Sequence, residues 1–171
     1  KLACILLRKS GEYGFTHIYH EFQINWDFHL PFKCIKCKSL LDSCTFDFQN
    51  KVCIIMDIKT TAKLWHFEDS MKEFDYCRQL CFYKDAVYWY FANVLGITDE
   101  FDKWRFEFYI IAIDTTGSNE IRVFRLDSSQ VCSRNDVIND VMTKIAWHMD
   151  KNLWEHGYEY YAGDGSETLN L

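Results

Sequence analysis

The sequence lacks several features that would place it in a common class. It has one proline, Pro31, and seven glycines in 171 residues, and it shows no repeat, low-complexity tract or linker. No stretch of about 18 apolar residues is free of charge, and residues 1–7 are too short for the core of a signal peptide. With 49% hydrophobic and 26% charged residues, the chain is expected to fold as one soluble domain over residues 1–171, without membrane association.

Acidic residues outnumber basic ones in this sequence. The formal net charge of −6 argues against a broadly basic surface, so binding of nucleic acid has to rest on a local patch or on bound metal ions. Glycine-rich phosphate loops, nucleophile elbows and His-Glu-x-x-His motifs are absent. Eight cysteines are scattered through the chain, several of them in apolar stretches, as reduced thiols of a cytoplasmic protein would be: Cys4, Cys53, Cys77, Cys81 and Cys132.

Cys34 and Cys37 form a Cys-x-x-Cys pair, a spacing found in zinc sites. His29 or Cys44 would have to supply the further ligands, because no second cysteine pair of this spacing accompanies it. Residues three apart in a straight strand point to opposite faces. We therefore expect the purified protein to contain no stoichiometric zinc.

The order of elements predicts an α/β or α+β domain, with helices packed against a mixed sheet. Alternating and apolar runs indicate strands, and apolar residues at helical spacing indicate helices, including a row at Val137, Val141, Ile145 and His148. The tail from residue 157 is too short to classify. The expected strands are 18–28, 32–48, 52–59, 105–114 and 120–126, and the expected helical regions are 67–95, stopped by Gly96, and 135–152.

The run Val52–Met56 is apolar on both faces, which is typical of the interior of a sheet, and it leads directly into Asp57 and Lys59. Burying an unpaired charge costs several kcal/mol. Asp57 and Lys59 are therefore expected where the strand emerges into a cleft. Residues two apart in a strand share a face, so the two side chains should lie side by side.

Two registers of the preceding hairpin bring a third charge to the same face. With a turn at Gln49-Asn50, Asp42 lies directly opposite Asp57; with a turn one residue later, it faces Lys59 instead. Facing carboxylates repel each other, and oxygen ligands suit Mg²⁺ or Mn²⁺. Lys59 could then hold or deprotonate a water beside a phosphate. The alternative is an ordinary cross-strand charge cluster on a solvated face.

The ordered set "SLLDS", "MDIKTT" and "YCRQLCFY" resembles the PD-(D/E)XK nucleases, especially the RecE, RecB and lambda-exonuclease branch. Asp42 matches the first acid of that pattern, Asp57 and Lys59 match its Asp-x-Lys, and Tyr76 and Gln79 match its helical Tyr-x-x-Gln. Tyr83 follows one turn later on the same helical face. The resemblance covers roughly residues 21–90. A weaker resemblance extends to the strands between residues 105 and 126.

The resemblance implies a restriction-endonuclease-like α/β core, with a mixed central sheet flanked by helices. It implies Mg²⁺ or Mn²⁺ on Asp42, Asp57 and the Ile58 carbonyl, and Gln79 orienting the water or Lys59. Glu21, on the neighbouring strand, is a further candidate metal ligand. The alternative is that Glu21 is an exposed strand carboxylate with no role in metal binding. Lys36 and Lys38 are an even number of residues from Asp42, so they are expected on the same face of the strand and could contact phosphates there. The candidate contacts with substrate are Thr60, Thr61, Tyr76, Tyr83, Lys36 and Lys38.

The expected function is therefore Mg²⁺-dependent hydrolysis of DNA phosphodiesters, by an exonuclease of recombination or repair type from a phage or other mobile element. DNA would be the main partner, beside further copies of the chain or a recombination protein. The alternative is a catalytically silent domain of the same fold that serves in binding or assembly. The N-terminal helix with a supporting His, usual in this branch, has no convincing equivalent in residues 1–19, although His17 and His20 precede the strand.

Overall fold

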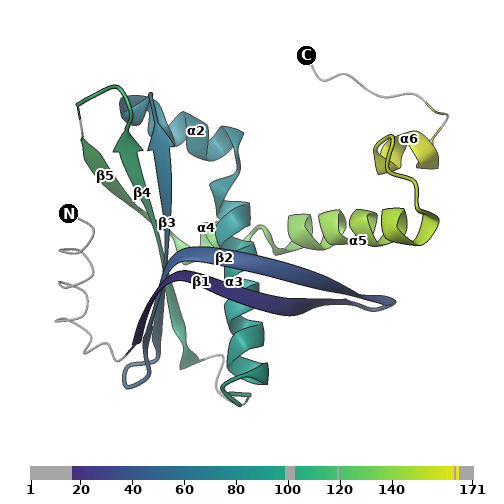
Figure 1. Cartoon of the computed structure of the whole chain (residues 1–171), viewed down its shortest axis with the longest axis horizontal. Helices are drawn as coiled ribbons and strands as arrows, with labels where there is room; N and C mark the ends of the chain where they lie inside the picture. Colours follow the sequence, from purple (N-terminus) through teal and green to yellow (C-terminus); the bar gives the residue numbers. More distant parts are fainter. Residues whose placement is uncertain (1–16, 99–102, 119, 164, 166–171) are drawn as a thin grey trace.

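The computed structural model describes residues 17–98, 103–118, 120–163 and 165. Within them a mixed sheet runs in the order β1-β2-β3-β4-β5, and helices pack against it (Figure 1). The α/β fold class expected from the sequence is confirmed. The elements are β1 (His17–Leu30), β2 (Lys33–Asp47), β3 (Val52–Thr61), the 3-10 turn η1 (Leu64–His66), α2 (Phe67–Glu73), α3 (Tyr76–Asn93), β4 (Arg105–Asp114), β5 (Ile121–Leu126), α4 (Ser128–Cys132), α5 (Asn135–Lys151) and α6 (Tyr158–Ala162).

Strand β3 is central, as its apolar run predicts. It pairs with β2 in antiparallel orientation and with β4 in parallel orientation. A parallel pair needs a crossover connection, which η1, α2 and α3 supply here. Cys53 and Ile55 face the main core under α3, whereas Ile54 and Met56 belong to a second apolar cluster on the other face. The carboxyl end of β3 lies at the edge of the sheet formed by the strand ends. Ligands of α/β folds commonly bind at this edge.

The predicted helical region 67–95 is two helices rather than one. The chain breaks after α2 at Asp75, whose φ of 45° is left-handed. This break directs α3 across the sheet, so that the first turns of α3 lie beside the end of β3. Gly96, with φ 67°, follows the last turn, as predicted for a helix stop. Helices α4 and α6 have five residues each and were not predicted, because so short a run shows no periodicity.

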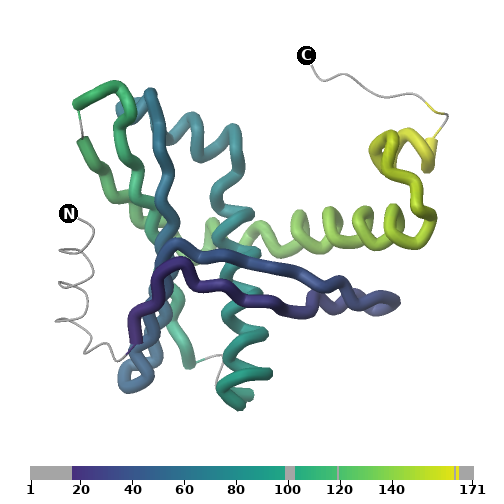
Figure 2. Tube along the Cα trace, viewed as in Figure 1, coloured from purple at the N-terminus to yellow at the C-terminus, as the bar shows by residue number. Residues whose placement is uncertain are grey.

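The hairpin of β1 and β2 forms an arm that swings away from the rest of the sheet (Figures 1 and 2). Its register is constant, from His17 opposite Phe46 to Leu30 opposite Lys33. The inward face changes parity along the arm, because Tyr19 and Phe22, three residues apart, both pack against the main core. The change occurs at Glu21, whose φ is 49°.

The parity change corrects one expectation. Lys36 and Lys38 do not share a face with Asp42. Towards the tip the odd-numbered Ile35 and Leu41 of β2 turn inward, so both lysines turn outward, whereas on the other side of the change the even-numbered Cys44 and Phe46 turn inward. Asp42 lies at the change and turns towards β3, where it accepts a hydrogen bond from the Ile58 backbone N–H. Both lysines are exposed, and Lys36 forms an ion pair with Asp27 at 2.8 Å. They lie on the outer face of the arm.

Helix α5 packs against α3 and against the arm (Figure 2). Ile138, Met142 and Ala146 are buried, and an ion pair between Lys33 and Asp150 ties α5 to the tip of the arm. The predicted apolar row was wrong for Val137 and Val141, each 38% exposed. Apolar residues cover more than one row of this helix. The contacts of α5 with α3 and the arm decide which of these rows is buried. None of the described helices is long and apolar enough to cross a membrane.

Candidate active site

Asp42 and Asp57 meet where β2 and β3 stop pairing. The ladder runs from Asp47 opposite Val52 to Ser43 opposite Met56, so the next position in register places Asp42 opposite Asp57. This confirms the register with the turn centred on Gln49-Asn50. Asp42 Oδ2 accepts a hydrogen bond from the Ile58 backbone N–H at 2.6 Å. That bond uses one of the two carboxylate oxygens and holds Asp42 against the end of β3.

Gln79 of α3 joins the acid and the base of β3 through its two amide atoms. Its Nε2 donates to Asp57 Oδ1 at 3.1 Å, and its Oε1 accepts from Lys59 Nζ at 2.9 Å. Lys59 Nζ also lies 2.7 Å from Asp57 Oδ2. Because a glutamine amide has a donor and an acceptor side, Gln79 fixes the orientation of the carboxylate and of the ammonium group at once.

The two tyrosines of α3 complete the cluster. Tyr83 accepts a hydrogen bond from Gln79 Nε2 at 2.7 Å, which fixes the amide from the far side. The ring of Tyr76 lies 4.9 Å from Lys59 Nζ, a cation–π distance, and stacks between Phe67 and Phe74. The spacing of Tyr76, Gln79 and Tyr83 on one helical face thus brings all three to the end of β3.

Asp57 is unusually placed for a carboxylate, since it is only 3% exposed. Burial raises its pKa above the ordinary value; the Lys59 ammonium opposes this, and the negative charge of Asp42 adds to it. Apart from the Lys59 ammonium, its buried Oδ2 has no hydrogen-bond partner among the described residues. A buried carboxylate oxygen in this state is costly unless a cation shares it.

A divalent cation fits these residues. Two carboxylates converge from adjacent strands, and the buried Oδ2 of Asp57 has the Lys59 ammonium as its one partner among the described residues. Hard oxygen ligands suit Mg²⁺ or Mn²⁺. Asp42 and Asp57 would hold the ion. The Ile58 carbonyl is the third ligand that the family resemblance implies, on a peptide that Asp42 already anchors.

The remaining candidates lie near the cluster but do not join it. The Thr61 hydroxyl accepts from the Lys63 backbone N–H at 2.9 Å and shapes the following turn, whereas Thr60 is exposed and alternates to the other face. Glu21 lies across from Asp42 in the register of the arm. It is exposed and makes no hydrogen bond or ion pair with the described part of the chain.

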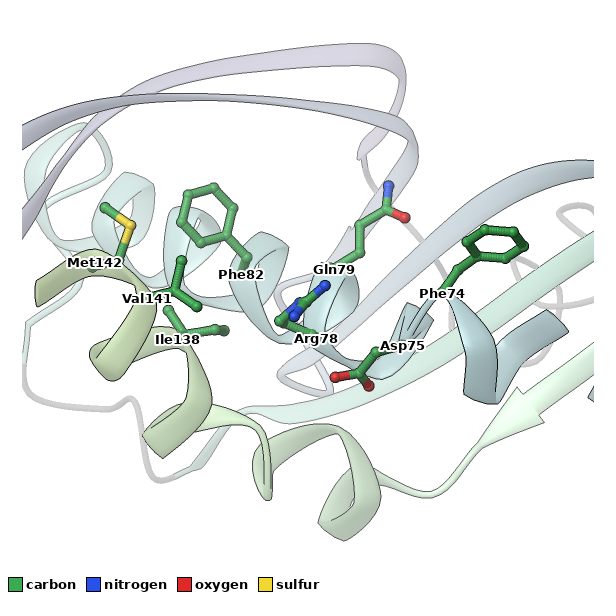
Figure 3. A pocket seen from close by; sticks show the side chains of 8 residues that line it. All are labelled: Phe74, Asp75, Arg78, Gln79, Phe82, Ile138, Val141 and Met142. Carbon is green, nitrogen blue, oxygen red and sulfur yellow. The ribbon is translucent and has the colours of Figure 1, made fainter. Parts of the chain in front are cut away.

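Residues of α5 extend the site in a way the sequence did not indicate. A groove of about 310 Å³ runs between α3 and α5 and reaches Gln79 (Figure 3). Phe74 and Phe82 lie on either side of Arg78 and Gln79, and Ile138, Val141 and Met142 form the opposite wall. Arg78 is next to Gln79 in the sequence, and this adjacency could have indicated it as a site residue. No feature of the sequence indicates that α5 packs beside it. The expectation about an N-terminal helix concerned residues 1–19, and residues 1–16 lie outside the described part of the chain. His17 and His20 belong to β1.

Comparison with known proteins adds evidence on the fold. No family model and no curated protein matches the sequence. A solved structure from Eubacterium rectale, described as a putative exonuclease, is similar over 98% of this chain and 60% of its own, with a TM-score of 0.55 and 12% identity. This likeness concerns the fold of the two chains. The structure of SSO0001 covers 83% of this chain and 56% of its own at 14% identity, with a TM-score of 0.42. The chain thus spans well under two thirds of either protein.

The raised pKa of Asp57 predicts how the metal-free protein responds to pH. The folded state binds this proton more tightly than the unfolded state. Its contribution to stability is therefore complete below the ordinary carboxyl pKa of 3.8 and is lost as the pH rises through the folded pKa. Asp114, whose pKa is lowered to about 2, has the opposite dependence. The informative measurement is therefore the difference in unfolding free energy between the parent and Asp57→Asn, from denaturant titrations at several pH values. It should grow in favour of Asp57→Asn as the pH rises, and a flat difference would contradict the prediction.

Proposed function

We propose that this chain is a nuclease domain that hydrolyses DNA phosphodiesters with Mg²⁺ or Mn²⁺, of the exonuclease type used in recombination or repair. One observation carries the proposal: Gln79 holds Asp57 and Lys59 together at the carboxyl end of a buried parallel strand. A charge cluster of merely structural origin would gain more from a solvated position. The nuclease-like fold supports the same reading.

The residues of the cluster have separable tasks. Asp42 and Asp57 would bind the ion, which when bound supplies Lewis-acid activation of the phosphate and of a water. Lys59 Nζ, held by Gln79 Oε1, would as an ammonium hold the attacking water beside the phosphate. As a neutral amine, after passing its own proton to solvent, it would take a proton from that water. Gln79 keeps the lysine and Asp57 in mutual orientation. Tyr83 fixes Gln79 in turn.

The groove beside Gln79 suits the nucleotide next to the scissile phosphate. Arg78 is exposed and would bind a neighbouring phosphate, while the rings of Phe74 and Phe82 would contact an unstacked base. The acidic chain would then bind DNA through a local set of cations and the metal ion rather than through a basic surface. Further copies of the chain or a recombination protein would extend this contact.

The proposal is tested by incubating the purified chain with linear and with covalently closed circular duplex DNA. Mg²⁺, Mn²⁺ or a chelator is present in parallel reactions, and Lys59→Ala prepared in the same way controls for contaminating nucleases. Degradation of linear DNA alone, dependent on the metal ion, is the expected result. Cleavage of circles would indicate an endonuclease instead. A folded protein that cleaves neither substrate would favour the silent binding or assembly domain.

A further inference from the structure

The outer face of the β1–β2 arm carries a second group of potential ligands that includes neither Asp42 nor Asp57. Beyond Glu21 the arm packs Trp26, Phe28 and Ile35 into the main core. Since strand residues alternate between faces, their neighbours Asp27, His29 and Cys34 must point outward. His29 and Cys34 are direct partners across the hairpin. One donor atom from each of Asp27, His29 and Cys34 lies within 4.8 Å of the others.

We propose that Asp27, His29 and Cys34 bind one Zn²⁺ ion at the tip of the arm, with water as the fourth ligand. A thiolate, an imidazole and a carboxylate are the three donor types that zinc takes in proteins. Donors of a tetrahedral zinc site lie roughly 3.3–3.8 Å apart when the bonds are about 2.0–2.3 Å long. Small rotations of the exposed His29 and Cys34 side chains close the remaining gap. Mg²⁺ is a poor fit, because it prefers oxygen donors.

This ligand set differs from the one suggested by the Cys-x-x-Cys spacing. Cys37 pairs with Trp26 and lies half-buried on the inward face, with its Sγ 3.6 Å from the Ile35 carbonyl oxygen. Burial raises the pKa of the Cys37 thiol, which keeps it protonated. This geometry argues against a metal ion shared by Cys34 and Cys37. The proposed site departs from the sequence-based expectation that the protein contains no stoichiometric zinc. The ligands that join Cys34 come from the partner strand instead.

Lys36 competes with the metal ion for Asp27. Its ammonium group lies 2.8 Å from the Asp27 carboxylate, on the same face of the arm, and both charges are solvent-accessible. An exposed ion pair of this kind is weak and easily exchanged. Lys36 should thus lower the affinity for zinc without preventing binding, and its removal should tighten the site.

Metal titration tests the site directly. Reduced, chelator-treated protein is titrated with Zn²⁺ by equilibrium dialysis, and with Co²⁺ to follow the sulfur-to-cobalt charge-transfer absorption that only a thiolate ligand produces. We expect a charge-transfer band that saturates at one Co²⁺ per chain and is lost when one Zn²⁺ per chain displaces that ion. An ion held by the carboxylates of Asp42 and Asp57 produces no such band. Cys34→Ala should abolish the band, and His29→Ala should weaken binding at least about tenfold. Lys36→Met should bind more tightly than the parent, whereas the matched Lys38→Met should not.

Two controls separate this site from other cysteines and from the carboxylates of β2 and β3. Cys37→Ala and Asp57→Asn should both keep the band and the affinity of the parent. Absence of zinc uptake, a band that survives in Cys34→Ala, or equal loss in Cys37→Ala would overturn the proposal. Because His29, Cys34, Lys36 and Lys38 are exposed, circular dichroism should show unaltered folding for the variants at these four positions. The partly buried Cys37 and the buried Asp57 need the same check before their titrations are compared with the parent. The outcome does not depend on nuclease activity, so failure here leaves the proposed function untouched.

Discussion

Asp57→Asn should abolish Mn²⁺ binding and DNA cleavage together, while the metal-free protein becomes more stable. The substitution replaces a carboxylate that would be a metal ligand by a neutral group of the same shape. Loss of an outer partner of a metal site already costs about 10–100-fold in affinity, so loss of the ligand itself should exceed about 100-fold. Stability should rise because Asp57 is 3% exposed, has a raised pKa and lies opposite a second negative charge.

Asp85→Asn is the matched control for this variant. Asp85 lies on the same helix as Gln79, its pKa is also raised by burial, and it pairs with Lys84 at 3.6 Å, away from the cluster. It should leave Mn²⁺ affinity and cleavage at the parent values. Calorimetric titration with Mn²⁺, single-turnover cleavage of a linear duplex and denaturant unfolding compare the three proteins. Binding of Mn²⁺ to Asp57→Asn with parent affinity would remove Asp57 from the metal site.

Lys59→Ala should separate metal binding from chemistry. Removing the ammonium 2.7 Å from Asp57 Oδ2 takes away a cation that competes for the carboxylate, so Mn²⁺ should bind as well as to the parent or more tightly. Cleavage should fall by about 10²–10⁴-fold, the usual loss when general acid–base assistance is removed. The same calorimetric and single-turnover measurements show both effects. The opposite changes in the two quantities distinguish this variant from Asp57→Asn.

Lys63→Ala provides the comparison for a lysine outside the cluster. Lys63 is exposed, four residues after Lys59, and the loss of its positive charge reproduces the effect of Lys59→Ala on net charge. It should cleave at nearly the parent rate. If Lys59→Ala also cleaves at the parent rate, then Lys59 is an ion-pair partner of Asp57 and not part of the reaction.

Local patterns in the sequence were sufficient for the elements around β3. The apolar run of Val52–Met56 predicted a buried strand, and the polar break before it predicted a hairpin in one of two registers. The structure has the register that sets Asp42 opposite Asp57. The spacing of Tyr76, Gln79 and Tyr83 gave one helical face. These inferences succeeded because they depend on the period of a strand, the length of a turn and the pitch of a helix, which act over a few residues.

Other features were decided only when distant segments packed together. The change of parity at Glu21 turned Lys36 and Lys38 away from Asp42, and a left-handed residue inside a strand leaves no sign in the apolar pattern. The packing of α5 against α3 chose Ile138 over Val137 as its buried row and built the groove beside Gln79. Contacts between elements tens of residues apart depend on the summed burial of many side chains, so the sequence determined which groups could react, and the tertiary structure decided which of them meet.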